Sequence, residues 1–206
     1  MPKEKLYLKA IAFDLGNVLV KVDHQRFCKE LARIAKTTPE DIFSAIFESG
    51  LESRFDTGRL SERDFYERVR KHLGLSVPFL QFCLLWNEIF EPMERIEEIL
   101  ERLYPRYPLF LLSNTNSLHF SYIEKRFIHI IPYFESFILS YLVGSRKPEP
   151  GIYQALIKEM GARPERCLFV DDKLPFVEAA REHSLVAWHF TDPQDFCRRL
   201  TEQGVW

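Results

Sequence analysis

The chain has 206 residues, 46% of them hydrophobic and 28% charged, so it can bury one domain core, with or without an insertion. Its formal net charge of -2 excludes a general attraction to nucleic acid or to an anionic membrane. No apolar run is long enough to span a bilayer, the segment Met1–Lys5 lacks the apolar part of a signal peptide, and the four scattered cysteines indicate reduced thiols, so we expect a cytoplasmic protein.

The first predicted element is a buried strand that begins at Ile11 and ends at Asp14. Ligands of open parallel sheets bind just past the carboxyl ends of the strands, so Asp14 is expected at a substrate site. Gly16 permits a tight turn there. A carboxylate in this place can act as a nucleophile, as a metal ligand or as both. The alternative is a turn or helix-capping aspartate, and this stretch alone leaves the choice open.

Residues from about 24 to 91 are predicted to be almost wholly helical, after a polar exit over 21–24. Phe27, Leu31 and Ile34 recur at helical spacing. Signals for helix starts, stops and breaks follow at Thr38, Asp56-Thr57-Gly58, Ser61 and Gly74. We interpret the block as a cap inserted over the carboxyl edge of the sheet. The predicted domains are a core formed by 1–22 and 92–206 and a helical cap formed by 23–91.

The second half of the chain alternates between helices and apolar strands. Helices are expected over Met93–Leu103, Ser117–Phe127, Pro148–Met160 and Val177–His183 and after Asp192-Pro193, and strands over Pro108–Ser113, Phe137–Leu139, Cys167–Val170 and Leu185–Trp188. This alternation predicts an α/β fold, a doubly wound parallel sheet covered by helices on both faces.

Polar groups follow three of the predicted strands. They are Asp14, the pair Ser113-Asn114 and the pair Asp171-Asp172, and Lys147 lies in a loop before a helix. Parallel strands bring such ends to one edge of a sheet. Neighbouring carboxylates repel each other unless a cation intervenes, and Mg²⁺ prefers a few carboxylates together with phosphate oxygens. The set therefore favours phosphoryl chemistry.

These motifs resemble the haloacid dehalogenase superfamily over nearly the whole chain. The matching segments, in the family's order, are Phe13–Leu19, Leu111–Asn116, Arg146–Tyr153 and Phe169–Asp172. Asp-Leu-Gly-Asn-Val together with Ser-Asn-Thr-Asn looks most like bacterial phosphatases that act on glucose 1-phosphate. Members of that branch carry a small helical cap.

The resemblance implies a role for each matching residue. Asp14 would attack phosphorus to form an aspartyl-phosphate, helped by Ser113 and Lys147. Mg²⁺ would be held by Asp14, the Gly16 carbonyl and Asp172, with Asp171 as a direct or water-bridged partner. Phosphate or substrate contacts are expected from Asn17, Ser113, Asn114 and Asn116. The implied function is Mg²⁺-dependent hydrolysis of a small phosphomonoester, with a sugar phosphate as the expected substrate.

One position departs from the family pattern. Most phosphatases of the superfamily carry a general acid/base aspartate where this chain has Gly16. Loss of that aspartate typically lowers the rate of catalysis by about 10²–10⁴-fold. Three interpretations follow. Asp23 or His24 could replace that aspartate as the acid, or the substrate has a good leaving group that needs less help from an acid. In the third, the protein binds phosphate with little turnover.

Dehalogenation of a 2-haloacid is the alternative enzyme activity, and it needs no metal. As partners we expect a small phosphate ester, no nucleic acid and no membrane. The expected assembly is a monomer or a weak homodimer.

Overall fold

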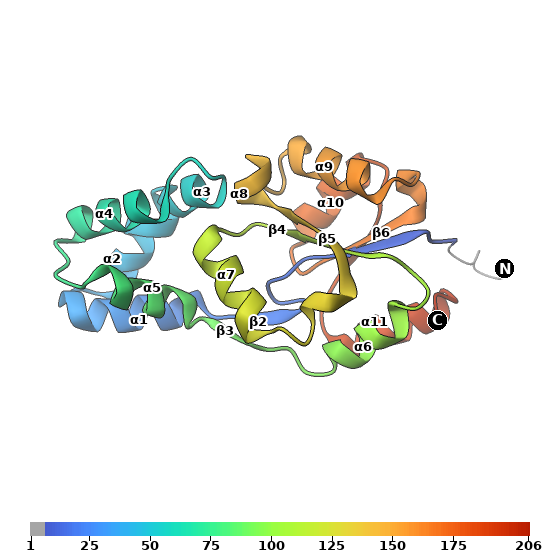
Figure 1. Cartoon of the computed structure of the whole chain (residues 1–206), viewed down its shortest axis with the longest axis horizontal. Helices are drawn as coiled ribbons and strands as arrows, with labels where there is room; N and C mark the ends of the chain where they lie inside the picture. Colours follow the sequence, from blue (N-terminus) through green and yellow to red (C-terminus); the bar gives the residue numbers. More distant parts are fainter. Residues whose placement is uncertain (1–6) are drawn as a thin grey trace.

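A five-stranded parallel sheet forms the centre of the computed structural model, which describes residues 7–206. The segment Met1–Lys5, to which the signal-peptide prediction applies, lies outside the described residues. The strand order is β5-β4-β1-β6-β7 (Figure 1). The strands are β1 (Ala10–Phe13), β4 (Leu109–Ser113), β5 (Phe134–Leu139), β6 (Cys167–Asp171) and β7 (Val186–His189). All four pairings are parallel, with β1 in the middle.

Helices cover both faces of this sheet. Because side chains alternate along a strand, Ile11 and Phe13 point to one face and Ala10 and Ala12 to the other. The first pair packs with α6 (Ile96–Leu103), α7 (Ser117–Arg126) and α11 (Pro193–Glu202). The second pair packs with α9 (Pro150–Met160) and α10 (Leu174–Glu182). The predicted doubly wound α/β fold is confirmed. The helices expected from Pro148 and Val177 begin instead at Pro150 and Leu174.

Three short helical segments complete this half. They are α8 (Ser140–Val143) and two 3₁₀ turns, Ile131–Tyr133 and Pro164–Arg166. Within residues 7–206, every helix is too short or too polar to cross a membrane.

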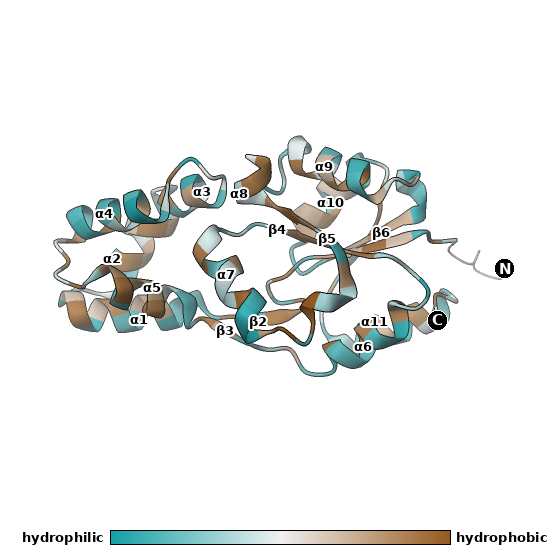
Figure 2. Cartoon of the chain, viewed as in Figure 1, coloured by the Kyte–Doolittle hydropathy of each residue, from teal (hydrophilic) through white to brown (hydrophobic). Residues whose placement is uncertain are grey.

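A helical region lies beyond the carboxyl ends of the strands (Figure 1). It contains α1 (His24–Ala35), α2 (Pro39–Phe43), a π-helical turn (Ser44–Glu48), α3 (Leu51–Asp56), α4 (Glu62–Leu73) and α5 (Phe79–Asn87). Phe27, Phe65 and Trp86 belong to a hydrophobic cluster of its own. Figure 2 shows hydrophilic residues along the outer side of α4 and hydrophobic ones toward the interior. The separate cluster supports the predicted division into core and cap, which stays a prediction.

A two-stranded antiparallel ribbon connects the two regions. It pairs β2 (Val20–Val22) with β3 (Phe90–Pro92). The expected polar exit over 21–24 and the expected helix up to 91 were therefore wrong at this point. Strands of three residues give almost no period-two signal, and their pairing joins segments that are far apart in the sequence. The ribbon carries the chain from the sheet into the helical region and back, next to the predicted cap boundaries at 23 and 91.

Candidate functional site

Three carboxylates meet at the carboxyl edge of the sheet. Asp14 follows β1, and Asp171 and Asp172 stand at the end of β6, the neighbouring strand. One oxygen of each lies within 4.8 Å of the others. The Lys147 Nζ donates to Asp14 Oδ1 at 2.7 Å and to Asp171 Oδ2 at 2.6 Å. Lys147 is only 1% exposed, so the structure brings these four predicted residues together in a buried ionic cluster.

The cluster carries more negative than positive charge. Burial raises the pKa of Asp14 to about 7, although the Lys147 ammonium opposes this shift. Burial and the neighbouring Asp171 also raise the pKa of Asp172. One ammonium beside three carboxyl groups is too little positive charge, and a divalent cation would restore the balance.

The free oxygens of the cluster suit such a cation. Asp172 Oδ1 is buried and has no hydrogen-bond partner among the described residues. Both oxygens of Asp171 are engaged, because its Oδ1 accepts from the Lys173 N–H at 2.8 Å and its Oδ2 from Lys147. Oxygen ligands are those that Mg²⁺ prefers. The donor set therefore fits Mg²⁺, with Asp14 and Asp172 better placed to coordinate it directly than Asp171.

The turn after β1 is shaped by Asn17 as well as by Gly16. Asn17 adopts a left-handed conformation (φ 56°), which asparagine tolerates better than most residues. Its Nδ2 donates to Asp172 Oδ2 at 3.2 Å, and its Oδ1 accepts from the Val22 N–H at 3.1 Å. A Cβ added to Gly16 would lie 3.1 Å from Val22 Cγ2. Any side chain at position 16 would thus crowd Val22, and Asn17 orients Asp172.

The end of β4 supplies the next two predicted residues. Ser113 is buried and lines the same cavity as Asp14. The Asn114 side chain braces the Lys147 loop, since its Oδ1 accepts from Lys147 N at 2.8 Å and its Nδ2 donates to Lys147 O at 3.0 Å. Sequence reasoning missed this brace, because it joins residues 33 positions apart. The expected phosphate contacts of Ser113 and Asn114 stay predictions.

Asn116 begins α7 as its N-cap, near a helix N-terminus as expected. Its Oδ1 accepts from the His119 N–H at 3.1 Å. Its Nδ2 donates to Asp56 Oδ1 at 2.9 Å. The amide therefore joins the core to the cap. A direct contact of Asn116 with substrate stays a prediction.

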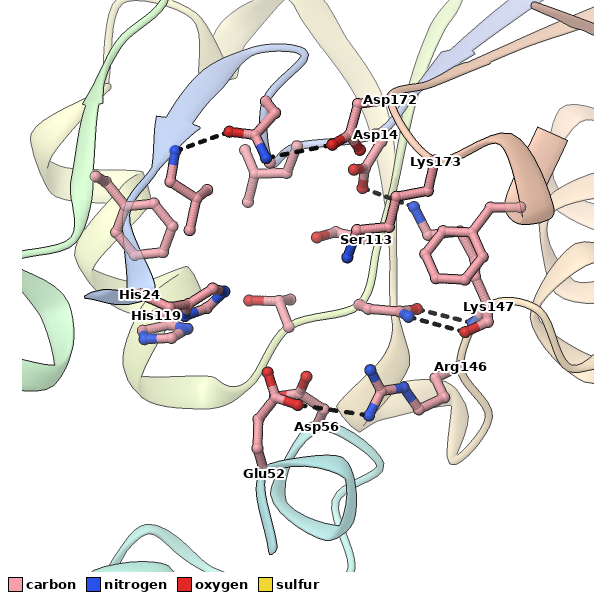
Figure 3. Close-up of a pocket in the computed structure, with 18 residues that line it drawn as sticks. Asp14, His24, Glu52, Asp56, Ser113, His119, Arg146, Lys147, Asp172 and Lys173 are labelled. Carbon is pink, nitrogen blue, oxygen red and sulfur yellow. Dashed lines mark hydrogen bonds and ion pairs between the residues drawn. The ribbon is translucent and has the colours of Figure 1, made fainter. Parts of the chain in front are cut away.

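The wall of the cavity opposite Asp14 comes from the cap. Figure 3 shows Glu52 and Asp56 reaching from α3 toward the space below Ser113, with Arg146 beside them. The cavity measures about 100 Å³. Sequence reasoning missed these cap residues and interpreted 56–58 only as a helix break. The signal available was a carboxylate four residues after another on one short helix.

Of the two residues suggested to replace the missing acid, only His24 lines this cavity. Asp23 is exposed and caps α1, with its Oδ1 accepting from the Arg26 N–H at 3.1 Å. Burial and the nearby Lys173 lower the pKa of His24 to about 4, so its ring is neutral at pH 7. A neutral ring holds no proton beyond its single N–H, which makes His24 a poor general acid.

Comparison with known proteins identifies relatives over nearly the whole chain. A model of the haloacid dehalogenase-like hydrolases matches residues 8–183. D-ribitol-5-phosphate phosphatase from Bacteroides thetaiotaomicron is 24% identical over 201 residues, which are 94% of this chain and 97% of that protein. A sesquiterpene phosphatase from Aspergillus oryzae is 25% identical over 202 residues, 94% of this chain and 95% of that protein.

Solved structures also include relatives that match nearly the whole chain. A haloacid dehalogenase family enzyme from Bacteroides thetaiotaomicron superposes with a TM-score of 0.84 at 26% identity, covering 94% of this chain and 98% of that one. Its complex with magnesium and inorganic phosphate superposes with a TM-score of 0.80 at 25% identity, covering 90% and 96% of the two chains.

Proposed function

Since this chain belongs to the haloacid dehalogenase-like hydrolases, we propose that it hydrolyses a small phosphomonoester with Mg²⁺ as cofactor, and that a sugar phosphate is its substrate. The superfamily predicted from the motifs is confirmed. The narrower resemblance to glucose 1-phosphate phosphatases stays a prediction. Two relatives that match over most of the chain are phosphatases, and a similar solved structure contains magnesium and inorganic phosphate.

One observation carries this proposal. Asp14, Asp171 and Asp172 gather around a buried lysine, and one buried oxygen of Asp172 has no partner among residues 7–206. A buried polar atom without a partner calls for an explanation, and a bound cation supplies one. Dehalogenation of a 2-haloacid needs no metal and would leave that oxygen unexplained, so the cluster favours phosphoryl transfer.

The chemistry that we assign to the chain is the one that the superfamily resemblance implies, and this geometry supports it. The Asp14 oxygen that Lys147 does not hold attacks phosphorus, the bond to the leaving oxygen breaks as that oxygen takes a proton from water, and an aspartyl-phosphate forms. Water then cleaves that intermediate and releases inorganic phosphate. Lys147 keeps Asp14 oriented, and Ser113 donates to a phosphate oxygen. Bound Mg²⁺ neutralises negative charge on the phosphoryl group and orients it.

Release of inorganic phosphate from a panel of small phosphate esters, with and without Mg²⁺, tests the proposal. Wild type should turn over at least one ester only when the metal is present. Asp14→Asn should abolish that turnover while leaving the melting temperature close to wild type. Asp23→Asn is the matched control, an exposed carboxylate that lies outside the cavity, and it should keep the wild-type rate.

The opposite results would count against the proposal. Phosphate release that needs no metal, or that survives in Asp14→Asn, would refute it. Chloride release from a 2-haloacid without Mg²⁺ would favour the alternative enzyme activity. Specific binding of phosphate esters without turnover would favour the alternative in which the protein binds phosphate but hardly hydrolyses it. The cytoplasmic location and the expected monomer or weak homodimer stay predictions.

A further inference from the structure

The cavity has two ends with different chemistry. The core end holds Asp14, Ser113 and Lys147, to which the phosphoryl group is assigned above. The other end is formed by cap residues Glu52 and Asp56 (Figure 3). In an in-line displacement the leaving group lies opposite the attacking oxygen. The cap end therefore faces the organic part of the ester.

Asp56 is held at this end by contacts on both sides of the cap boundary. It is 3% exposed, and its Oδ1 accepts from Asn116 Nδ2 at 2.9 Å. Two residues later, Gly58 has a φ of +69°, and a Cβ there would lie 2.4 Å from the Tyr141 carbonyl oxygen of α8. The end of α3 thus packs so closely on the core that only glycine fits. Asp56 is fixed at the cavity and does not swing freely from the cap surface.

Glu52 lies one helical turn before Asp56, so the two side chains share a face of α3. Arg146 forms an ion pair with Glu52 at 3.7 Å. Burial, together with Glu52, raises the pKa of Asp56 to about 8, while Asn116, Arg146 and Lys173 act in the opposite direction. The raised pKa favours the protonated carboxyl, which can both donate and accept a hydrogen bond.

A further polar atom lies on another side of the same cavity. His24 Nδ1 is buried and has no partner among the described residues. Buried polar groups of native proteins are nearly always hydrogen-bonded, so this atom indicates a ligand with its own donors or acceptors. An alkyl or isoprenoid leaving group would offer none.

From these contacts we propose that Asp56, with Glu52 beside it, selects phosphomonoesters whose leaving group is a short chain bearing several hydroxyl groups. Asp56 binds one hydroxyl directly, and Asn116 is the positioning residue that holds the carboxyl. A cavity of about 100 Å³ is far smaller than the roughly 300–1,000 Å³ of a drug-sized site, in keeping with a short chain. This inference rests on the proposed phosphatase function.

A pair of substrates of equal carbon number tests it. We would measure kcat/KM for a pentitol 5-phosphate and for n-pentyl phosphate with saturating Mg²⁺, and take the ratio of the two. The ratio does not depend on how much of a variant is folded. Wild type should prefer the pentitol phosphate by at least about 10²-fold, because the unhydroxylated analogue leaves buried polar groups unpaired.

The variants separate hydrogen bonding from shape. Asp56→Ala should lower the ratio by roughly tenfold to a hundredfold, as expected for losing a strong hydrogen bond. Asp56→Asn keeps the size and most of the hydrogen-bonding capacity, so it should retain most of the preference. The control, Glu67→Gln, changes a carboxylate on α4 outside the cavity and should leave the ratio unchanged.

A wild-type ratio near one, a preference for pentyl phosphate, or an unchanged ratio in Asp56→Ala would each overturn the inference while leaving the phosphatase proposal intact. Absence of Mg²⁺-dependent phosphate release from either compound and from p-nitrophenyl phosphate would refute the proposed function, and this inference with it.

Discussion

His119 is a buried neutral histidine whose replacement should change how stability depends on pH. It lies in α7, is 6% exposed, and stacks on the Trp86 ring of the cap with ring centroids 4.7 Å apart. Its Nε2 is 2.9 Å from the Trp86 carbonyl oxygen. Because a carbonyl only accepts, Nε2 carries the proton, and Nδ1 accepts from Asn116 Nδ2 at 3.3 Å.

The size of the effect follows from the pKa in the two states. Burial, and then the neighbouring His24, lower the pKa of His119 from 6.5 to about 3. Between these values the unfolded chain binds the proton and the folded chain does not, so stability falls as the pH drops below 6.5. At pH 5 the loss is about 1.5 × 1.36, or about 2 kcal/mol, relative to pH 8.

Thermal or urea unfolding of wild type and of a His119 variant, each at pH 8 and at pH 5, measures this contribution, because Asp14 and Asp56, whose raised pKa values act in the opposite direction, are present in both proteins. A change of about 2 kcal/mol corresponds to roughly 4–8 °C in melting temperature for a chain of this size. The change in free energy of unfolding from pH 8 to pH 5 should be about 2 kcal/mol more favourable to the folded state in His119→Gln than in wild type, whatever the stability of the variant at pH 8. The control, His72→Gln, alters an exposed histidine of the cap and should keep the wild-type dependence on pH.

The same change in stability between pH 8 and pH 5 in His119→Gln as in wild type would contradict this prediction. Burial would then not hold the ring neutral. His24, whose pKa is also lowered, contributes in the same direction. The contribution of His24 to the pH dependence of stability is present in both wild type and His119→Gln, so it cancels when the two are compared.

Three more predictions concern the ionic cluster. Lys147→Met should cost about 3–5 kcal/mol of stability, because it leaves two buried carboxylates without their cation. Added Mg²⁺ should recover part of that loss in a melting assay. A variant that melts at the wild-type temperature without metal would contradict this prediction. Asp172→Ala should abolish Mg²⁺ binding detectable by calorimetry in the absence of substrate, and retained affinity would remove Asp172 from the ligand set. Asn17→Ala should weaken Mg²⁺ binding by roughly tenfold to a hundredfold, because the Asn17 amide orients Asp172, and an unchanged affinity would mean that this hydrogen bond does not matter.

The residues at the strand ends could be predicted from the sequence alone. Apolar runs at 11–13, 109–112 and 167–170 each stop at polar side chains, and parallel strands deliver such stops to one edge of a sheet. Local pattern and a general rule of topology together were enough for the α/β fold and for the grouping of Asp14, Asp171 and Asp172. The motif order then indicated the superfamily.

Contacts between distant segments needed the tertiary structure. The ribbon between β2 and β3 was missed because three residues carry too little periodicity. Asn114 was expected at the phosphate, and the fold also makes its side chain the brace of the Lys147 loop. The local sequence around position 114 does not indicate which backbone groups will come within hydrogen-bond distance of the Asn114 side chain.

The helical cap shows most clearly which features could be predicted from the sequence and which needed the tertiary structure. Its helical character was readable from the spacing of apolar residues, since that depends on neighbours within one or two turns. The place of Asp56 in the cavity depends on how α3 packs against α8, through a glycine that allows the two backbones to touch. Sequence pattern therefore determined where the carboxylates gather, since parallel strands end at one edge of the sheet, and packing between cap and core decided which side chains line the rest of the cavity.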